Sequence, residues 1–186
     1  SFPTRRSSDL SRLMLAYYVV SVFGLWVWRK LGIKTSKHYA AGIACLYAIV
    51  VLLIGFIGYW FIKDFEDFSK LIGVGSFIIL YGFAFSGPLP LINAITADIS
   101  DKLNLEGGEN ISGTVFSYLT TLTKIGFALA AVVPYVVLEF LWGFDISLGI
   151  ENSTSSKMAI FYIYTFVPAI RYSIAAYLLF SHSLTR

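Results

Sequence analysis

Five long apolar stretches, separated by short polar connections, dominate the chain. They cover about residues 13–28, 39–62, 71–97, 113–142 and 158–180. Each is near or above the roughly 20 residues that cross a bilayer core as a helix. None alternates strictly between apolar and polar residues, as a barrel strand would. The pattern therefore predicts an all-α integral membrane protein with about five transmembrane helices.

The composition supports this class and excludes several others. Of the 186 residues, 57% are hydrophobic and 13% are charged, whereas a soluble domain has about 45–50% and 25%. The net charge of +3 is too small to indicate a nucleic-acid partner. With Cys45 as its single cysteine, the chain has no intrachain disulfide, and a Cys/His zinc site would lack ligands.

The first ten residues, SFPTRRSSDL, differ from the rest of the chain. They are polar, show no capping pattern toward the next segment and lack the cleavage motif of a signal peptide. We expect residues 1–10 to be a non-native, adapter-like prefix and residues 11–186 to form the transmembrane bundle. A genuine short extramembrane tail is the alternative.

The basic residues of the connections predict the orientation in the membrane. With alternating spans, the cytoplasmic side receives six of them and the opposite side four, apart from the prefix, which favours a cytoplasmic C-terminus. The six are Arg29, Lys30, Lys34, Lys37, Lys102 and Arg186, and the four are Arg12, Lys63, Lys70 and Lys157. Trp26 and Trp28 precede the basic connection, where we expect them to act as interfacial anchors.

Lys124 is the clearest functional candidate, because an ionisable side chain inside a span is costly. It lies about a dozen residues into the fourth stretch, too deep to reach water easily. Ser117, Thr120 or Thr121, and Lys124 recur at helical spacing and form one polar stripe. The stripe is expected to face a water-filled cavity or another helix. Pairing of Lys124 with a carboxylate, purely for packing, is the alternative.

Arg171 lies near the middle of the fifth stretch and raises the same question. Pro168 upstream is expected to kink the helix and open its backbone. The sequence leaves two roles open for Arg171, contact with a cavity or a structural pair.

The third stretch is interrupted by residues that disfavour a regular helix. Gly87, Pro88 and Pro90 stand in its middle and predict a bend or a local unwinding. Transporters use such breaks at binding sites and hinges. Asn93 and Thr96 follow on one face.

Asp98 and Asp101 at the end of this stretch support two different chemistries. Two carboxylates at i and i+3 could hold Mg²⁺ on a diphosphate, as in a membrane-embedded transferase. Such an enzyme needs a second carboxylate cluster, and the other spans offer only Glu139. The second hypothesis places the pair in a charged cytoplasmic latch that opens and closes in a transporter, and we prefer it. No metal site and no enzyme are therefore predicted.

Residues 92–131 resemble the segment that joins the tenth and eleventh helices of the glycoside–pentoside–hexuronide:cation symporters, which are melibiose-permease-like sugar transporters of the major facilitator superfamily (MFS). The family pattern is Ala-Asp, two residues, Asp, a spacer, Gly-x-Arg-x-x-Gly and a helix with a central Lys followed by small residues. The matching positions are Ala97, Asp98, Asp101, Gly108, Gly113, Lys124, Gly126 and Ala128. The family arginine falls on Asn110 and the later acidic residue on Ser112, so Asp98 and Asp101 need another partner, for which Arg29, Lys30 or Lys34 are candidates.

The resemblance implies a C-terminal fragment of a twelve-helix carrier of the bacterial inner membrane. The five helices would be the eighth to the twelfth, and the N-terminal half would hold most of the site for a coupling H⁺, Na⁺ or Li⁺. Lys124, Thr120, Thr121 and Asn93 would bind the sugar, whereas Asp98, Asp101, Gly108, Gly113, Gly87, Pro88 and Pro90 would serve coupling and gating. No cofactor is implied. A third hypothesis is a non-transporting helix bundle in which Lys124 and Arg171 pair with the acids of a partner subunit.

Overall fold

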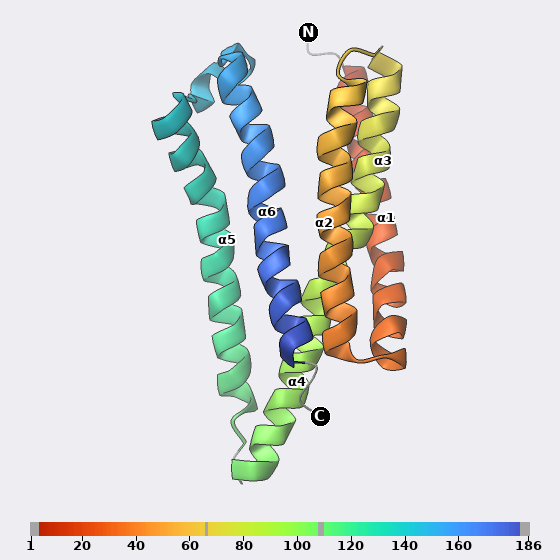
Figure 1. Ribbon diagram of the computed structural model, residues 1–186, viewed down its shortest axis with the longest axis vertical. Helices are drawn as coiled ribbons and strands as arrows, with labels where there is room; N and C mark the ends of the chain where they lie inside the picture. Colours follow the sequence, from red (N-terminus) through yellow and green to blue (C-terminus); the bar gives the residue numbers. More distant parts are fainter. Residues whose placement is uncertain (1–3, 66, 108–109, 183–186) are drawn as a thin grey trace. The chain divides into compact units, whose positions relative to one another are not determined.

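The computed structural model describes residues 4–65, 67–107 and 110–182, and Figure 1 shows that these ranges consist mainly of long helices. The helices are α1 (Thr4–Lys34), α2 (Lys37–Ile62), α3 (Asp67–Phe85), α4 (Pro88–Gly107), α5 (Ser112–Trp142), the short 3₁₀ helix η1 (Ile146–Glu151) and α6 (Thr154–His182).

Five helical stretches of the described residues are long and apolar enough to cross a membrane. They are Ser11–Lys34, Lys37–Ile62, Leu71–Gly107, Ser112–Trp142 and Thr154–Ser181. The predicted fold class, an all-α protein with five membrane spans, is confirmed.

Helix α1 is much longer than the apolar stretch from which it was predicted. It runs from Thr4 to Lys34, because no proline interrupts these residues and the polar residues on both sides of the apolar part continue the helix. The turn to α2 is short. The Ser36 hydroxyl oxygen caps α2 by accepting a hydrogen bond from the Tyr39 N–H at 3.1 Å, which satisfies one of the free donors at the helix start.

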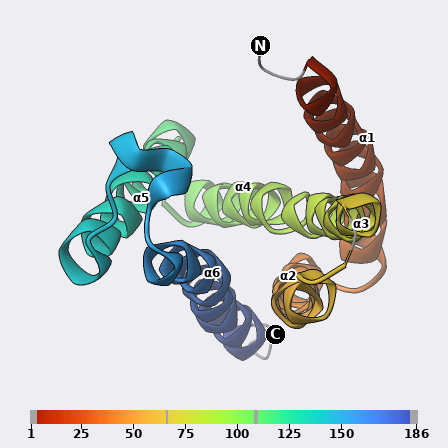
Figure 2. The ribbon, with the colours of Figure 1, turned by 90° about the horizontal axis from the view of Figure 1, so that it is seen from above.

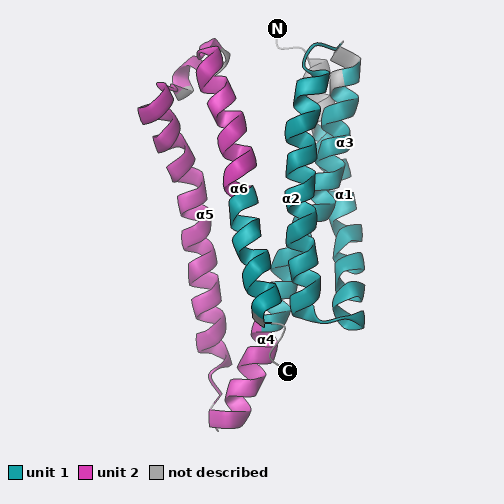
Figure 3. Ribbon diagram, in the orientation of Figure 1, with its two compact units in different colours: residues 1–95, 169–186 teal, residues 96–168 magenta. Residues whose placement is uncertain are grey.

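The chain divides into two compact units, coloured separately in Figure 3. Unit 1 comprises residues 1–95 and 169–186, and unit 2 comprises residues 96–168. The boundaries fall inside α4 and α6, so each of these helices contributes to both units.

In unit 1, helices α1, α2 and α3 pack against one another (Figures 1 and 2). Small side chains make this packing close, as expected where lipid provides no hydrophobic drive between helices. The buried face of α2 consists largely of Ala40, Ala41, Ala44, Cys45 and Ala48. A Cβ added at Gly42, on the same helix, would come within 2.7 Å of the Phe180 ring.

In unit 2, hydrogen bonds within the connection from α5 to α6 stabilise its conformation. Gly143 ends α5 in the left-handed conformation, with φ at 60°, and its N–H donates to the Glu139 carbonyl at 3.0 Å. Asp145 and Asn152 then bond to each other twice, from the Asp145 N–H to Asn152 Oδ1 at 2.8 Å and from Asn152 Nδ2 to the Asp145 carbonyl at 2.6 Å. The Ser156 hydroxyl donates to the Trp142 carbonyl at 2.8 Å.

Asp145 also caps η1 through its carboxylate. The Ser147 hydroxyl and the Ser147 N–H donate to Asp145 Oδ1 at 2.6 and 2.8 Å. These two bonds favour the charged form, so they lower the pKa of Asp145 below its ordinary value of 3.8.

Candidate functional site

The third apolar stretch is broken at Ser86 and Gly87, between α3 and α4. In a continuous helix the Phe83 carbonyl would accept from the Gly87 N–H, but this N–H points to the Ala84 carbonyl at 3.4 Å. The Ala84 carbonyl cannot accept the regular helical hydrogen bond from residue 88, because Pro88 has no N–H. The Gly-Pro sequence therefore leaves the Phe83 carbonyl without its main-chain donor.

Two side chains supply donors to this carbonyl. The Trp28 Nε1–H of α1 donates to the Phe83 oxygen at 3.0 Å, and the Ser86 hydroxyl donates to it at 2.8 Å. Trp28 is only 5% exposed. Its predicted role as an interfacial anchor is therefore wrong, whereas Trp26 is 53% exposed and has the exposure of an anchor. A buried polar group is stabilised when such bonds are made.

Glycines on α1 and α3 allow the close approach that these bonds require. A Cβ added at Gly24 would lie 2.2 Å from the Ser86 hydroxyl oxygen, and one at Gly82 would lie 2.9 Å from the Tyr17 carbonyl. At Gly87, an added Cβ would lie 2.7 Å from the Ala44 Cβ and 3.0 Å from the Trp28 ring. Gly87 thus breaks the helix and also admits neighbours from α1 and α2.

The two prolines follow this break at the start of α4. Pro88 is buried and is the first residue of α4, where its missing N–H costs least. Pro90 lines a cavity of about 460 Å³ in unit 1, together with Ser86 and Gly87. Arg29 and Lys37 also line this cavity, and the Lys37 amine donates to the Ala94 carbonyl at 3.5 Å.

Lys124, Thr120 and Thr121 lie on α5 in unit 2, and all three side chains are exposed. Among the described residues of unit 2, none hydrogen-bonds or ion-pairs with the Lys124 amine. Asn93 is exposed on the part of α4 that belongs to unit 1. The convergence of Asn93 and the α5 residues on one sugar site stays a prediction.

Asp98 and Asp101 are exposed on α4, within unit 2. The next basic residue, Lys102, forms an exposed ion pair with Glu106 at 3.8 Å. The connection to α5 is fixed by Asn104, whose amide donates to the Ser112 hydroxyl and accepts from the Ile111 N–H, both at 2.8 Å. The role of Asp98 and Asp101 in a cytoplasmic latch stays a prediction, because these contacts do not test it.

Of the two glycines of the Gly-x-Arg-x-x-Gly pattern, only Gly113 lies among the residues that the structure describes. Gly113 lies near the start of α5 and has open space around it, with no atom within 4 Å of an added Cβ. Gly108 lies outside the described residues.

Arg171, whose role the sequence leaves open, lies on α6 within unit 1. Its guanidinium stacks over the Tyr172 ring, with 4.6 Å between the guanidinium carbon and the ring centroid. In the described part of unit 1, Arg171 thus contacts the Tyr172 ring and not a carboxylate, and a cation–π contact at an exposed site such as this is worth about 0.5–1 kcal/mol.

Gly24, the buried position of Trp28 and Ser100 were not predicted from the sequence. Ser21, Gly24 and Trp28 lie at helical spacing on one face of α1, and this run of small residues before a Trp was the available signal. Ser100 is 1% exposed, and its hydroxyl has no hydrogen-bond partner among the residues that the structure describes.

The five spans and the broken third span define a multi-pass helical membrane protein with polar groups at positions where lipid would disfavour them. The sequence matches the family described as MFS/sugar transport protein over residues 5–186. The chain belongs to this family. Comparisons with curated proteins and with solved structures give no match. Because the family consists of transport proteins and not of enzymes, the transferase hypothesis is set aside.

Proposed function

We propose that the chain is the C-terminal part of a sugar:cation symporter of the glycoside–pentoside–hexuronide type. Its five spans correspond to the eighth to twelfth helices of a twelve-helix carrier, and its C-terminus lies in the cytoplasm of a bacterium. Membership of the MFS/sugar transport protein family supports sugar transport. The order of Asp98, Asp101, two glycines and Lys124 supports the finer assignment.

The position of Lys124 is the observation that carries this proposal. Lys124 comes 12 residues after the start of α5 and 18 before its end, or about 18 and 27 Å at 1.5 Å per residue. A lysine side chain is too short to reach water from that depth by snorkelling. A charge there requires a polar environment, and an exposed amine beside Thr120 and Thr121 provides one wall of a hydrated cavity.

Sugar binding by these groups follows from their donor and acceptor capacity. The Lys124 ammonium has three donors and gives charge-assisted hydrogen bonds to sugar hydroxyl oxygens. The Thr120 hydroxyl both donates and accepts, as a sugar hydroxyl does. Thr121 and Asn93 provide further contacts, and the coupling cation binds mainly outside this chain.

Alternating access requires helices whose segments can change their relative angle. The Ser86–Gly87 break between α3 and α4 is suited to such a change. Side chains hold the Phe83 carbonyl at the break, so a change in the angle between α3 and α4 need not leave a main-chain group unpaired. Gly87, Pro88 and Pro90 provide the bend, and Asp98 and Asp101 act in the cytoplasmic latch.

The test is Lys124→Ala in the complete gene product, with uptake of a panel of labelled glycosides measured in intact cells. Uptake is expected to fall at least tenfold, while the amount of protein in the membrane fraction stays unchanged. Lys157→Ala removes an equal charge from an exposed residue near the start of α6, and uptake by this control should stay near wild type. Wild-type uptake by Lys124→Ala would refute the assignment.

A further inference from the structure

Two cavities of unit 1 lie along the same side of α1. The first has a volume of about 460 Å³ and the second of about 350 Å³. Both are lined by Leu25 of α1 and by Ser86 and Pro90 at the helix break. Because they share these residues, the cavities are adjacent along α1 and the α3–α4 break, and together we call them the α1 groove.

The α1 groove is long and apolar over most of its length. Its lining extends along α1 from Tyr17 to Ile33, a distance of about 24 Å at the helical rise. Half the hydrocarbon core of a bilayer is about 15 Å thick. The other walls include Phe85, Leu89 and Leu91. A groove of this length and lining fits a hydrocarbon chain.

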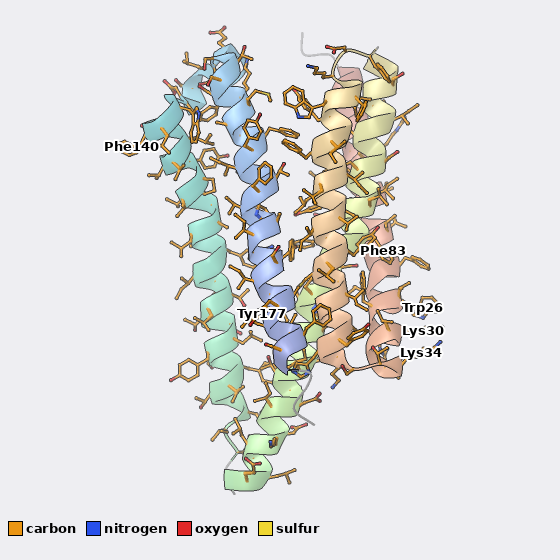
Figure 4. The ribbon with its side chains drawn as sticks, in the orientation of Figure 1. Trp26, Lys30, Lys34, Phe83, Phe140 and Tyr177 are labelled. Carbon is orange, nitrogen blue, oxygen red and sulfur yellow. The ribbon has the colours of Figure 1, made fainter. Side chains whose placement is uncertain are left out.

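Positive charge is confined to one end of the α1 groove. Arg29 and Lys37 line this end, and no acidic residue occurs between residues 29 and 37. Asp64 follows the far end of α2, one helix length away. Figure 4 shows Trp26, Lys30 and Lys34 at this same end of α1, and the Lys30 amine lies 3.8 Å above the Trp26 ring. An aromatic ring beside basic residues marks the level of the lipid headgroups.

We propose that the α1 groove binds an anionic phospholipid. The acyl chain lies along Leu25, Phe85 and Leu89, and the phosphate accepts hydrogen bonds from Arg29 and Lys37. Basic pockets between transmembrane helices bind anionic headgroups in this manner, and arginine is suited to bidentate phosphate contacts. A zwitterionic lipid would satisfy the apolar walls but would bring no net negative charge to the two cations.

This site reaches the hinge of the third span, because Ser86, Gly87 and Pro90 form its inner wall. A lipid chain seated there contacts the break from the α1 side. The lipid would therefore stabilise one angle between α3 and α4 over another, in proportion to its differential affinity for the two.

The experiment uses the complete protein, purified in mild detergent and mixed with vesicles of equal parts phosphatidylglycerol and phosphatidylcholine. Native mass spectrometry then counts the phospholipids that remain bound. The wild type should retain phosphatidylglycerol at least fivefold over phosphatidylcholine. Equal retention of the two lipids would overturn the proposal, and so would competition by millimolar inorganic phosphate, which would indicate a site for free anions.

Two double variants separate the groove from general surface charge. R29Q/K37Q is expected to lose at least fivefold of the bound phosphatidylglycerol. K30Q/K34Q carries the same charge change at the same end of α1, at residues that do not line the groove, and should stay within twofold of the wild type. An equal loss in both variants would show that charge alone attracts the lipid and would overturn the proposal.

A third variant tests occupation of the groove without changing any charge. Ala94 lines the groove beside Arg29 and Lys37, and Ala94→Phe places a ring in the space assigned to the headgroup. Retention of phosphatidylglycerol should fall to the level of R29Q/K37Q, whereas unchanged retention would overturn the groove assignment. If R29Q/K37Q does not fold, R29Q alone keeps the bond from Lys37 to the Ala94 carbonyl and should show an intermediate loss, and wild-type retention by R29Q would count against the proposal.

Discussion

The glycines of this protein differ in how closely neighbouring atoms approach them. Gly24, Gly82 and Gly87 face atoms that leave no room for a methyl group, whereas others, such as Gly58 of α2, have no atom within 4 Å of an added Cβ. The same substitution should therefore change stability in opposite directions at the two kinds of position.

Gly87→Ala is expected to destabilise the protein by about 1–3 kcal/mol, as overpacking of a close-packed site does. Its Cβ would meet Ala44 at 2.7 Å and the Trp28 ring at 3.0 Å. Gly58→Ala, the matched control, should stabilise α2 by about 0.5–1 kcal/mol, because alanine is the better helix former. Thermal unfolding in detergent, followed by circular dichroism, measures both. Stabilisation by Gly87→Ala would contradict the close packing at the break.

The two tryptophans before the basic connection show the limit of sequence analysis at this scale. Trp26 and Trp28 stand on either side of Val27 and have the same amphipathic ring. Their positions differ by two residues, about 200° around a helix, so one faces outward and the other faces α3. Which of them is buried depends on where α3 lies, and local sequence contains no such information.

Among the elements, the break between α3 and α4 follows from local sequence, whereas the hydrogen bond from Trp28 to the Phe83 carbonyl at the break does not. Gly87 disfavours a regular helix and Pro88 lacks a main-chain donor wherever they occur, so the interruption of the third stretch could be predicted. One of the two donors that satisfy the Phe83 carbonyl comes from Trp28, 55 residues earlier in the chain. A contact of that separation requires the packed structure.

The connection from α5 to α6 is an element whose stability should depend on pH. The pKa of Asp145 is lowered in the folded state, so its capping contribution is present above the ordinary value of 3.8. The contribution is lost as the pH falls from that value through the lower folded-state value.

Hydrogen exchange of the Ser147 amide measures this dependence. Its protection factor should be constant from neutral pH down to about the ordinary aspartate range and should fall in more acidic solution. Asp145→Asn keeps a capping oxygen without an ionisable group, so its protection should not change over the same range. A parallel decline in wild type and variant would show that Asp145 is not the cause.

For the molecule as a whole, the number of spans and the family could be predicted from the sequence. Apolar length determines whether a helix can cross a bilayer, and a few charged positions in fixed order carried the resemblance. Lys124 could be singled out because its cost in lipid depends only on its own helix. The predicted convergence of Lys124 and Asn93 is of another kind, since it depends on how several helices assemble and not on one helix alone.

The predicted orientation can be tested with single cysteines, because Cys45 is only 1% exposed. In the complete protein, with other cysteines replaced, a membrane-impermeant maleimide should label Lys63→Cys in intact cells. Ser181→Cys should be labelled only after the cells are permeabilised, because three spans separate the two positions. Labelling of Ser181→Cys in intact cells would place the C-terminus outside.

The hydrogen bond from Trp28 to Phe83 also sets an order for the biogenesis of the protein. Its acceptor is synthesised 55 residues after its donor, and at about 5–20 residues per second this takes about 3–11 s. During that interval α1 is already made, and its indole N–H has no α3 to contact. An indole ring with an apolar body and a polar edge is stable at the level of the lipid headgroups, so the Trp28 ring can lie there until α3 is present. The docking of α1 against α3 is therefore a step that begins only when the third span has entered the membrane.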